Sequence, residues 1–192
     1  MKLLVDKIKS EGRIIDDGIL KVDSFINHQV DSTLMEALGN DIAAHYANAN
    51  ITKVVTIESS GIAPALMAAK ALGVPMVIMK KQPSAKLNTN LLHTQVTSFT
   101  KEINYELTVS ADFISEDDHI LIVDDFLANG EAATGAIRLI RMCHATVAGV
   151  SVLIEKSFQP GHEKLVSQGI DVYALARIKS LSANGITFLD EE

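Results

Sequence analysis

The sequence lacks the features that would indicate a secreted, disulfide-linked or membrane-spanning protein. It has one cysteine, Cys143, so a disulfide within the chain is impossible and nothing points to an oxidising compartment. No run of about 18 uninterrupted apolar residues is present, and therefore no membrane span is expected. The apolar run at the start of the chain is too short for a signal peptide. These absences predict a cytoplasmic protein.

The sequence also has fewer basic than acidic residues. The chain has 17 Lys and Arg residues against 24 Asp and Glu residues, and its formal net charge is -7. A general nucleic-acid binder needs a basic face for phosphate contacts, so no nucleic-acid partner is expected. A local basic pocket for a small phosphorylated molecule remains compatible with this composition. The six histidines form no pattern of metal-ligand spacing.

What is present is a large supply of apolar residues. They make up 47% of the 192 residues, which is enough to build one sizeable core. No linker, repeat or low-complexity tract divides the chain. We therefore expect a single domain over residues 1–192, with its core in residues 51–192 and an N-terminal segment in residues 1–50.

Apolar runs alternate with helical patterns after residue 50. The expected strands and helices, in chain order, are strand 54–57, helix 64–72, strand 76–79, strand 120–123, helix 131–144 and strand 150–154. Strands that are apolar throughout indicate a parallel sheet covered on both faces. The fold class is therefore α/β, with a central, mainly parallel sheet flanked by helices.

The N-terminal segment is expected to hold short elements. An amphipathic helix is predicted over residues 1–11, followed by extended segments at 13–15 and 19–22. A second helix should begin near Asp31, because Thr33 and Glu36 have the spacing of a capping box.

Residues 82–118 fit neither pattern. The segment has no stripe of apolar residues at helical spacing, and we interpret it as strand pairs around a long, flexible loop. Long irregular insertions in compact domains are usually functional. Surface strands are the competing interpretation.

Charged or small polar residues follow each of the expected strands. They are Glu58-Ser59-Ser60-Gly61, Lys80-Lys81, Asp124-Asp125 and Glu155-Lys156. Ligands of open α/β sheets bind beyond the carboxyl ends of the strands. The sequence therefore predicts a functional site where these ends converge.

The most informative stretch is residues 120–132, which read I-L-I-V-D-D-F-L-A-N-G-E-A. A buried strand ends in two carboxylates, and a glycine-containing loop then opens a helix. Backbone N–H groups of such a loop can point at a phosphate, helped by the positive end of the helix. The carboxylates can accept hydrogen bonds from ribose hydroxyls. The alternative is an ordinary strand–loop–helix junction with an Asp-rich cap.

This stretch resembles the phosphoribosyl-pyrophosphate (PRPP) signature of the type I phosphoribosyltransferases, and the resemblance extends from about Lys53 to Lys156. The family often has hydroxyl residues beside the loop glycine, where this chain has Asn129 and Ala132. A loop of the Ala-Asn-Gly type resembles the xanthine-using branch. The resemblance implies transfer of 5-phosphoribose from PRPP to xanthine in purine salvage, forming xanthosine 5'-monophosphate and pyrophosphate.

The resemblance also implies a fold and a set of partners. Residues 1–50 would form a hood that caps the base, and residues 82–118 a flexible loop that closes over the site and excludes water. Magnesium would bind together with PRPP, and the protein would be a homodimer.

Site residues follow from the same resemblance. The expected catalytic residues are Asp124 and Asp125. The expected PRPP-binding residues are Ala128, Asn129, Gly130, Glu131, Ala132, Ser59, Ser60, Gly61 and Lys81. The expected xanthine contacts are Leu20, Asn27 and Lys156. Tyr105 is expected on the flexible loop, and Phe158 is either a base-stacking side chain or a core aromatic.

Two alternatives remain open. The base could be guanine or hypoxanthine, because the amide of Asn27 can either donate or accept a hydrogen bond. The chain could instead be a non-catalytic regulator that senses PRPP. Regulators of that kind carry a winged-helix module, whereas the roughly 50 residues before the first expected sheet strand contain few bases and no recognition-helix pattern.

Overall fold

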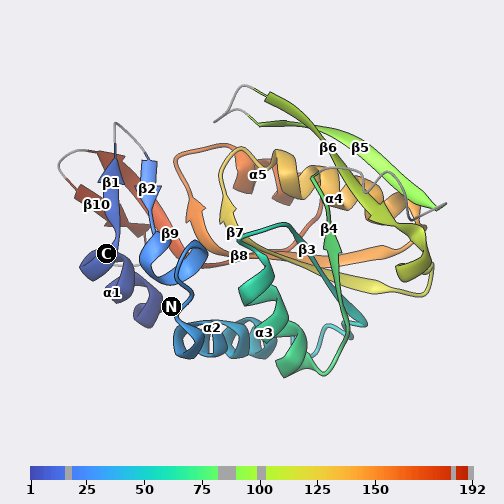
Figure 1. Cartoon of the computed structure of the whole chain (residues 1–192), viewed down its shortest axis with the longest axis horizontal. Coiled ribbons are helices and arrows are strands. Elements are labelled where there is room, and N and C mark those ends of the chain that lie inside the picture. The colour runs from blue at the N-terminus through green and yellow to red at the C-terminus, as the bar shows by residue number, and fades with distance from the viewer. Residues whose placement is uncertain (16–18, 82–89, 99–102, 183–184, 190–192) are drawn as a thin grey trace.

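The computed structural model describes residues 1–15, 19–81, 90–98, 103–182 and 185–189. At its centre is a six-stranded sheet with the strand order β10-β9-β8-β7-β3-β4 (Figure 1). These strands are β3 (Lys53–Ile57), β4 (Met76–Met79), β7 (His119–Leu127), β8 (Thr146–Lys156), β9 (Val172–Ser182) and β10 (Gly185–Phe188). All neighbours pair in parallel except β10, which is antiparallel to β9.

The four strands expected from apolar runs are all present. β7 and β8 are longer than predicted, because pairing continues beyond the apolar runs: His119 pairs with Thr146 at one end, and Asp124 pairs with Val152 and Leu127 with Glu155 at the other. β9 and β10 were not predicted. β9 begins with five apolar residues, 172–176, that the expected strands did not include, and it continues through Arg177, Lys179 and Ser180.

Helices cover both faces of the sheet, as the apolar strands predict (Figure 1). One face carries α1 (Lys2–Glu11), α2 (Ser32–His45) and α3 (Ile62–Leu72), and the other carries α4 (Glu131–Met142) and α5 (Gly161–Val166). Adjacent residues of β3 pack on opposite faces of the sheet. Val54 belongs to the core cluster under α2 and α3, and Val55 belongs to the cluster under α4.

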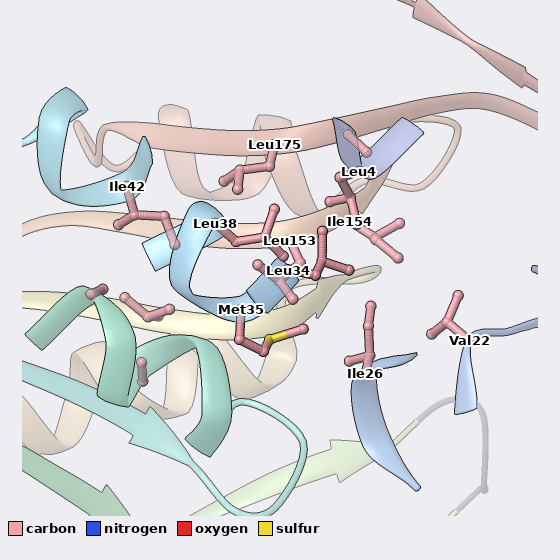
Figure 2. Close-up of a cluster of buried hydrophobic side chains, with 14 of the residues drawn as sticks. Leu4, Val22, Ile26, Leu34, Met35, Leu38, Ile42, Leu153, Ile154 and Leu175 are labelled. Atoms are coloured by element: carbon pink, nitrogen blue, oxygen red, sulfur yellow. The ribbon is translucent and has the colours of Figure 1, made fainter. Parts of the chain in front are cut away.

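The N-terminal segment packs on the first of these faces. It contains α1, the short strands β1 (Arg13–Ile15) and β2 (Ile19–Lys21), and a π-helical turn, η1 (Asp23–Asn27). Figure 2 shows Val22 and Ile26 beside the cluster that includes Ile154 of β8. The segment is therefore anchored next to the carboxyl end of a central strand.

The start of α2 corrects one prediction. The helix begins near Asp31 as expected, but Asp31 itself is the N-cap, and its carboxylate accepts a hydrogen bond from Leu34 N at 3.0 Å. The capping box of Thr33 and Glu36 is wrong, because Glu36 lies inside the helix and pairs with Lys70 of α3 at 3.0 Å.

The segment 82–118 contains the expected strand pair. β5 (Leu91–Ser98) and β6 (Ile103–Ser110) form an antiparallel hairpin, and a 3-10 turn, η2 (Ala111–Phe113), follows. The hairpin packs on α4, where Arg138 Nη1 donates to Thr94 Oγ1 at 2.5 Å. Residues 82–89 and 99–102 of the predicted flexible loop lie outside the described residues. Within the described ranges, no helix is both long and apolar enough to cross a membrane.

Candidate active site

The loop between β7 and α4 has the geometry of an anion-binding site. β7 ends at Leu127, and α4 begins at Glu131. Gly130 is the N-cap and has φ +77, a left-handed conformation that glycine adopts without steric cost. The first N–H groups of α4 have no acceptor within the helix, and they lie at the positive end of its dipole. The loop therefore presents donors suited to a phosphate.

Two adjacent carboxylates lie near the end of β7, shortly before this loop. Asp124 and Asp125 are half-buried, and the backbone N–H of Asp125 donates to Asp124 Oδ1 at 2.9 Å. Burial raises the pKa of Asp124 well above its ordinary value, and the negative charge of Asp125 raises it further. The positive charge of Lys81 lowers the pKa of Asp124 and so opposes these two effects. The pair is thus poised to accept hydrogen bonds or a cation.

The loop after β3 abuts this pair. A Cβ atom on Gly61 would lie 2.7 Å from Asp124 Oδ1 and would also clash with Thr56 Oγ1. Glycine is therefore required for the loop to approach Asp124. Ser59 is exposed and Ser60 half-buried on the same loop, and the peptide bond between Glu58 and Ser59 is cis.

Glu58 connects that loop to the end of β4. Its carboxylate accepts a hydrogen bond from the backbone N–H of Lys81 at 2.7 Å and pairs with Lys80 Nζ at 3.2 Å. The ion pair partly neutralises Lys80, while the ammonium group of Lys81 lies 5.7 Å from the ring centroid of Tyr105. The sequence places Glu58 in the loop after the first expected strand but indicates no individual role for its carboxylate. The available signal was an acid at the end of β3 facing two lysines at the end of the adjacent parallel strand.

Tyr105 of β6 lies beside Lys81 and lines the same cavity as Asp124. Burial raises the pKa of its phenol, and the negative charge of Asp124 adds to this effect. A cavity of about 140 Å³ is lined by Thr97 and Tyr105 of the hairpin, by Asp124, and by residues 126–133. A larger, mostly apolar cavity of about 830 Å³ lies between β4 and β6, away from the carboxylates. The structure thus brings together the hairpin, the carboxylates and the loop before α4.

Lys156 occupies the end of β8. It is half-buried, and burial lowers the pKa of its ammonium group. Phe158 follows and is 47% exposed, so the interpretation of Phe158 as a core aromatic is wrong. Beside them a cavity of about 400 Å³ is bordered by Phe158, Glu155 and His162. The buried carboxylate of Glu155 accepts a hydrogen bond from Ser157 Oγ at 2.6 Å.

Leu20 and Asn27 occupy different environments. Leu20 of β2 is 7% exposed and belongs to a core cluster, whereas Asn27 is exposed at the end of η1. Their connection to the end of β8 is made by a neighbour, Ile26, which shares a core cluster with Ile154. The side chain of Asn27 is therefore exposed, whereas Leu20 already packs against protein.

Among the residues that the structure describes, no three His, Cys, Asp or Glu side chains are grouped to hold a metal ion. Asp124 and Asp125 supply carboxylate oxygens of the kind that Mg²⁺ prefers. A cation nearby would relieve the repulsion between the two carboxylates.

Comparison with known proteins agrees with this geometry. Residues 28–173 match the family model of the phosphoribosyl transferase domain, and the chain belongs to this family. It is 63% identical to xanthine phosphoribosyltransferase of Agathobacter rectalis over the full length of both chains. It is 52% identical to xanthine phosphoribosyltransferase 1 of Clostridium botulinum over 98% of this chain and 100% of that one.

Solved structures confirm the expected fold. Adenine phosphoribosyltransferase of Rhodothermus marinus superposes with a TM-score of 0.75 at 24% identity, covering 92% of this chain and 99% of that one. At that level of identity the likeness establishes the architecture alone: the type I phosphoribosyltransferase fold, with a mainly parallel central sheet flanked by helices.

Proposed function

We propose that this protein transfers 5-phosphoribose from PRPP to N9 of xanthine and releases pyrophosphate. The observation that supports the reaction is the meeting of two loops suited to anions, residues 59–61 and 128–132, at the carboxylate pair Asp124–Asp125. PRPP carries two such anions, a 5-phosphate and a pyrophosphate, on either side of a ribose. The choice of xanthine rests on the full-length relatives that are named for it.

The chemistry requires positioning and charge stabilisation rather than a covalent nucleophile. In this proposal the backbone N–H groups of residues 128–132 bind the 5-phosphate. Ser59, Ser60 and Gly61, together with Lys81, bind the pyrophosphate. Asp124 and Asp125 accept hydrogen bonds from the ribose hydroxyls, and their negative charge favours the positive charge that develops on the ribose as its bond to pyrophosphate breaks.

Lys156 is proposed to donate a hydrogen bond to the 6-oxygen of the base. The partly exposed ring of Phe158 is available to lie against the purine face. Asn27 contributes its amide to the 2-oxo edge, and the small exposed part of Leu20 contributes an apolar contact to the base. Tyr105 closes the site from the hairpin side, which limits hydrolysis of the activated ribose.

Magnesium is proposed as the cofactor, bound with PRPP near Asp124 and Asp125. When bound, it would neutralise charge on the leaving pyrophosphate. We also propose that the protein is a cytoplasmic homodimer, which light scattering on the full chain would test. A monomeric mass at the concentrations used for assays would contradict the dimer without affecting the reaction.

The decisive assay measures pyrophosphate release with Mg²⁺ and PRPP while xanthine, guanine, hypoxanthine and adenine are offered separately. Fastest turnover with xanthine is expected. In parallel, Asp125→Asn should reduce turnover by about 10²-fold, because a carboxylate that acts on the transition state is lost. Unchanged turnover in Asp125→Asn would remove the role assigned to the pair.

Guanine or hypoxanthine is the second candidate for the base, because the exposed amide of Asn27 can present either a donor or an acceptor to the 2-position. Preference for one of these bases would keep the mechanism and overturn the xanthine assignment. Saturable PRPP binding without turnover on any base would point instead to a PRPP-sensing regulator.

A further inference from the structure

The start of α5 packs directly against the loop between β7 and α4. The backbone N–H of Gly161 donates to the carbonyl oxygen of Ala128 at 2.9 Å. A Cβ atom on Gly161 would clash with that carbonyl oxygen and would lie 2.9 Å from Gly130 N. A Cβ on Gly130 would in turn lie 3.1 Å from Gly161 Cα. Two backbones thus meet here with no room for a side chain.

The hydrogen bond from Gly161 orients a donor of the loop. In a trans peptide unit the C=O and the following N–H point in opposite directions. Because the carbonyl of Ala128 points at α5, the N–H of Asn129 points away from α5. Asn129 lines the cavity that also contains Asp124. The contact with Gly161 therefore directs this N–H toward the ligand side of the loop.

A second contact from α5 concerns charge. Lys164 Nζ pairs with Glu131 Oε1 at 2.5 Å, and Glu131 is the first residue of α4. A carboxylate at this position stabilises the helix end but repels a phosphate bound there. Lys164 compensates that charge and keeps the carboxylate turned toward α5.

We propose that Gly161 and Lys164 are positioning residues for the phosphate-binding loop: Gly161 sets the path of its backbone, and Lys164 neutralises the acid beside it. The inference rests on the proposed function, in which residues 128–132 bind the 5-phosphate of PRPP. Neither residue needs to touch the substrate. Their effect should appear in affinity for a 5-phosphate and be absent from affinity for pyrophosphate, which binds at residues 59–61.

Calorimetric titration with ribose 5-phosphate and, separately, with inorganic pyrophosphate in the presence of Mg²⁺ tests this. Gly161→Ala should weaken ribose 5-phosphate binding about tenfold or more, because the loop must shift by a sizeable fraction of an ångström. Pyrophosphate affinity should stay at the wild-type value. Equal affinity of folded Gly161→Ala and wild type for ribose 5-phosphate would overturn the proposal.

The matched control is Gly39→Ala, on the opposite face of the sheet. A Cβ there would lie 2.5 Å from Met67 Cβ and 2.6 Å from its carbonyl carbon, so the variant is strained to a similar degree. It should lose thermal stability and keep the wild-type affinity for ribose 5-phosphate. An equal loss of ribose 5-phosphate affinity in Gly39→Ala would show a general folding effect and would contradict the role of Gly161.

Lys164→Met decides the matter if Gly161→Ala does not fold. It should weaken ribose 5-phosphate binding roughly three- to tenfold, as expected for an uncompensated charge near an anion, and addition of Glu131→Gln should restore much of the loss. Wild-type affinity in Lys164→Met would then overturn the proposal. Failure of the proposed function looks different: the wild-type protein would bind neither probe and would release no pyrophosphate.

Discussion

At the scale of single residues, the candidate site is built around a carboxyl group that is costly to ionise. Asp124 lies beside Asp125 and is largely withdrawn from water, and both effects raise its pKa. In the unfolded chain both side chains are hydrated, so burial no longer acts and water weakens the repulsion between the two neighbours. The arrangement therefore lowers the stability of the unliganded fold at neutral pH and prepares the pair for hydroxyls and a cation, a common compromise at catalytic sites.

Asp124→Asn should accordingly stabilise the unliganded protein at pH 7. Because the folded-state pKa of Asp124 is raised, the folded protein binds the proton more tightly than the unfolded chain, and stability is lost as pH rises from the ordinary Asp value of 3.8 through the raised value. The variant lacks this loss. Thermal unfolding should show a higher melting temperature than wild type, by roughly 2–4 °C per kcal/mol gained.

The same variant should lose about 10²-fold in kcat/KM, because a transition-state interaction disappears. The difference in melting temperature between wild type and variant should shrink toward pH 4. There Asp124 is protonated and neutral, as the asparagine of the variant is at every pH. A variant that melts below wild type at pH 7 would contradict the electrostatic account of Asp124.

At the scale of elements, helix ends and the hairpin are stabilised by contacts that can be tested one at a time. α2 begins at Asp31, whose carboxylate accepts from Leu34 N and also pairs with Lys7 at 3.2 Å. The N–H of Leu34 and the charge of Lys7 lower the pKa of Asp31. This one side chain therefore caps α2 and links it to α1.

Asp31→Ala should lower the melting temperature by a few degrees, because the cap hydrogen bond is lost. Thr33→Ala, the matched control within the first turn, should have a much smaller effect. Since the pKa of Asp31 is lowered in the folded state, its contribution is present above the ordinary Asp value and disappears as pH falls through the folded value. Equal melting temperatures of the two variants at pH 7 would contradict the role of Asp31 as the N-cap of α2.

The β5–β6 hairpin is fixed to α4 by buried side chains. Leu107 is fully buried, and Val96 and Leu107 belong to the core cluster that includes Ile137 of α4. A Cβ on Gly135 of α4 would lie 2.6 Å from Val96 Cγ2, so a small residue is needed for this close approach. The hairpin thereby holds Tyr105 beside the carboxylates.

Leu107→Ala should destabilise the protein by about 2–5 kcal/mol, because it leaves a cavity between the hairpin and α4. It should also raise KM for PRPP, since Tyr105 lies two residues away on the same strand. Leu66→Ala on α3, where the side chain is 50% exposed, is the control and should change little. Denaturant unfolding and initial rates measure both effects; wild-type stability in Leu107→Ala would show that the hairpin is not packed as described.

At the scale of the whole molecule, the candidate site joins segments far apart in the chain. Gly61 follows β3, Lys81 follows β4, and Asp124 lies in β7, while Tyr105 comes from the hairpin. A ligand that spans these segments should hold them together and stabilise the entire fold.

PRPP with Mg²⁺ should therefore raise the free energy of unfolding, by about 2.7 kcal/mol at a concentration of 100 times its Kd. Differential scanning fluorimetry should show a shift for PRPP that exceeds that for ribose 5-phosphate or pyrophosphate alone at the same concentration. In Asp125→Asn the shift with PRPP should shrink. A shift identical to that of wild type would separate PRPP binding from the carboxylate pair.

Much of this protein was determined by its sequence alone, because the signals are local. Apolar runs identify β3, β4, β7 and β8, and α3 ends at Leu72 as expected, with Gly73 (φ 72) as its C-cap. The two acids, the loop and Gly130 follow one another within a few residues, so their shared environment at the end of a buried strand could be predicted directly.

Only the tertiary structure decided which distant groups meet. The hydrogen bond from Arg138 to Thr94, the contact of Gly161 with Ala128 and the packing of Val96 on Gly135 each join residues more than 20 positions apart. Hydrophobic period and turn chemistry describe neighbours along the chain and say nothing of such pairs. β9 was missed although it begins with the apolar run 172–176. Its polar second half is a strand because it pairs with β8 and β10.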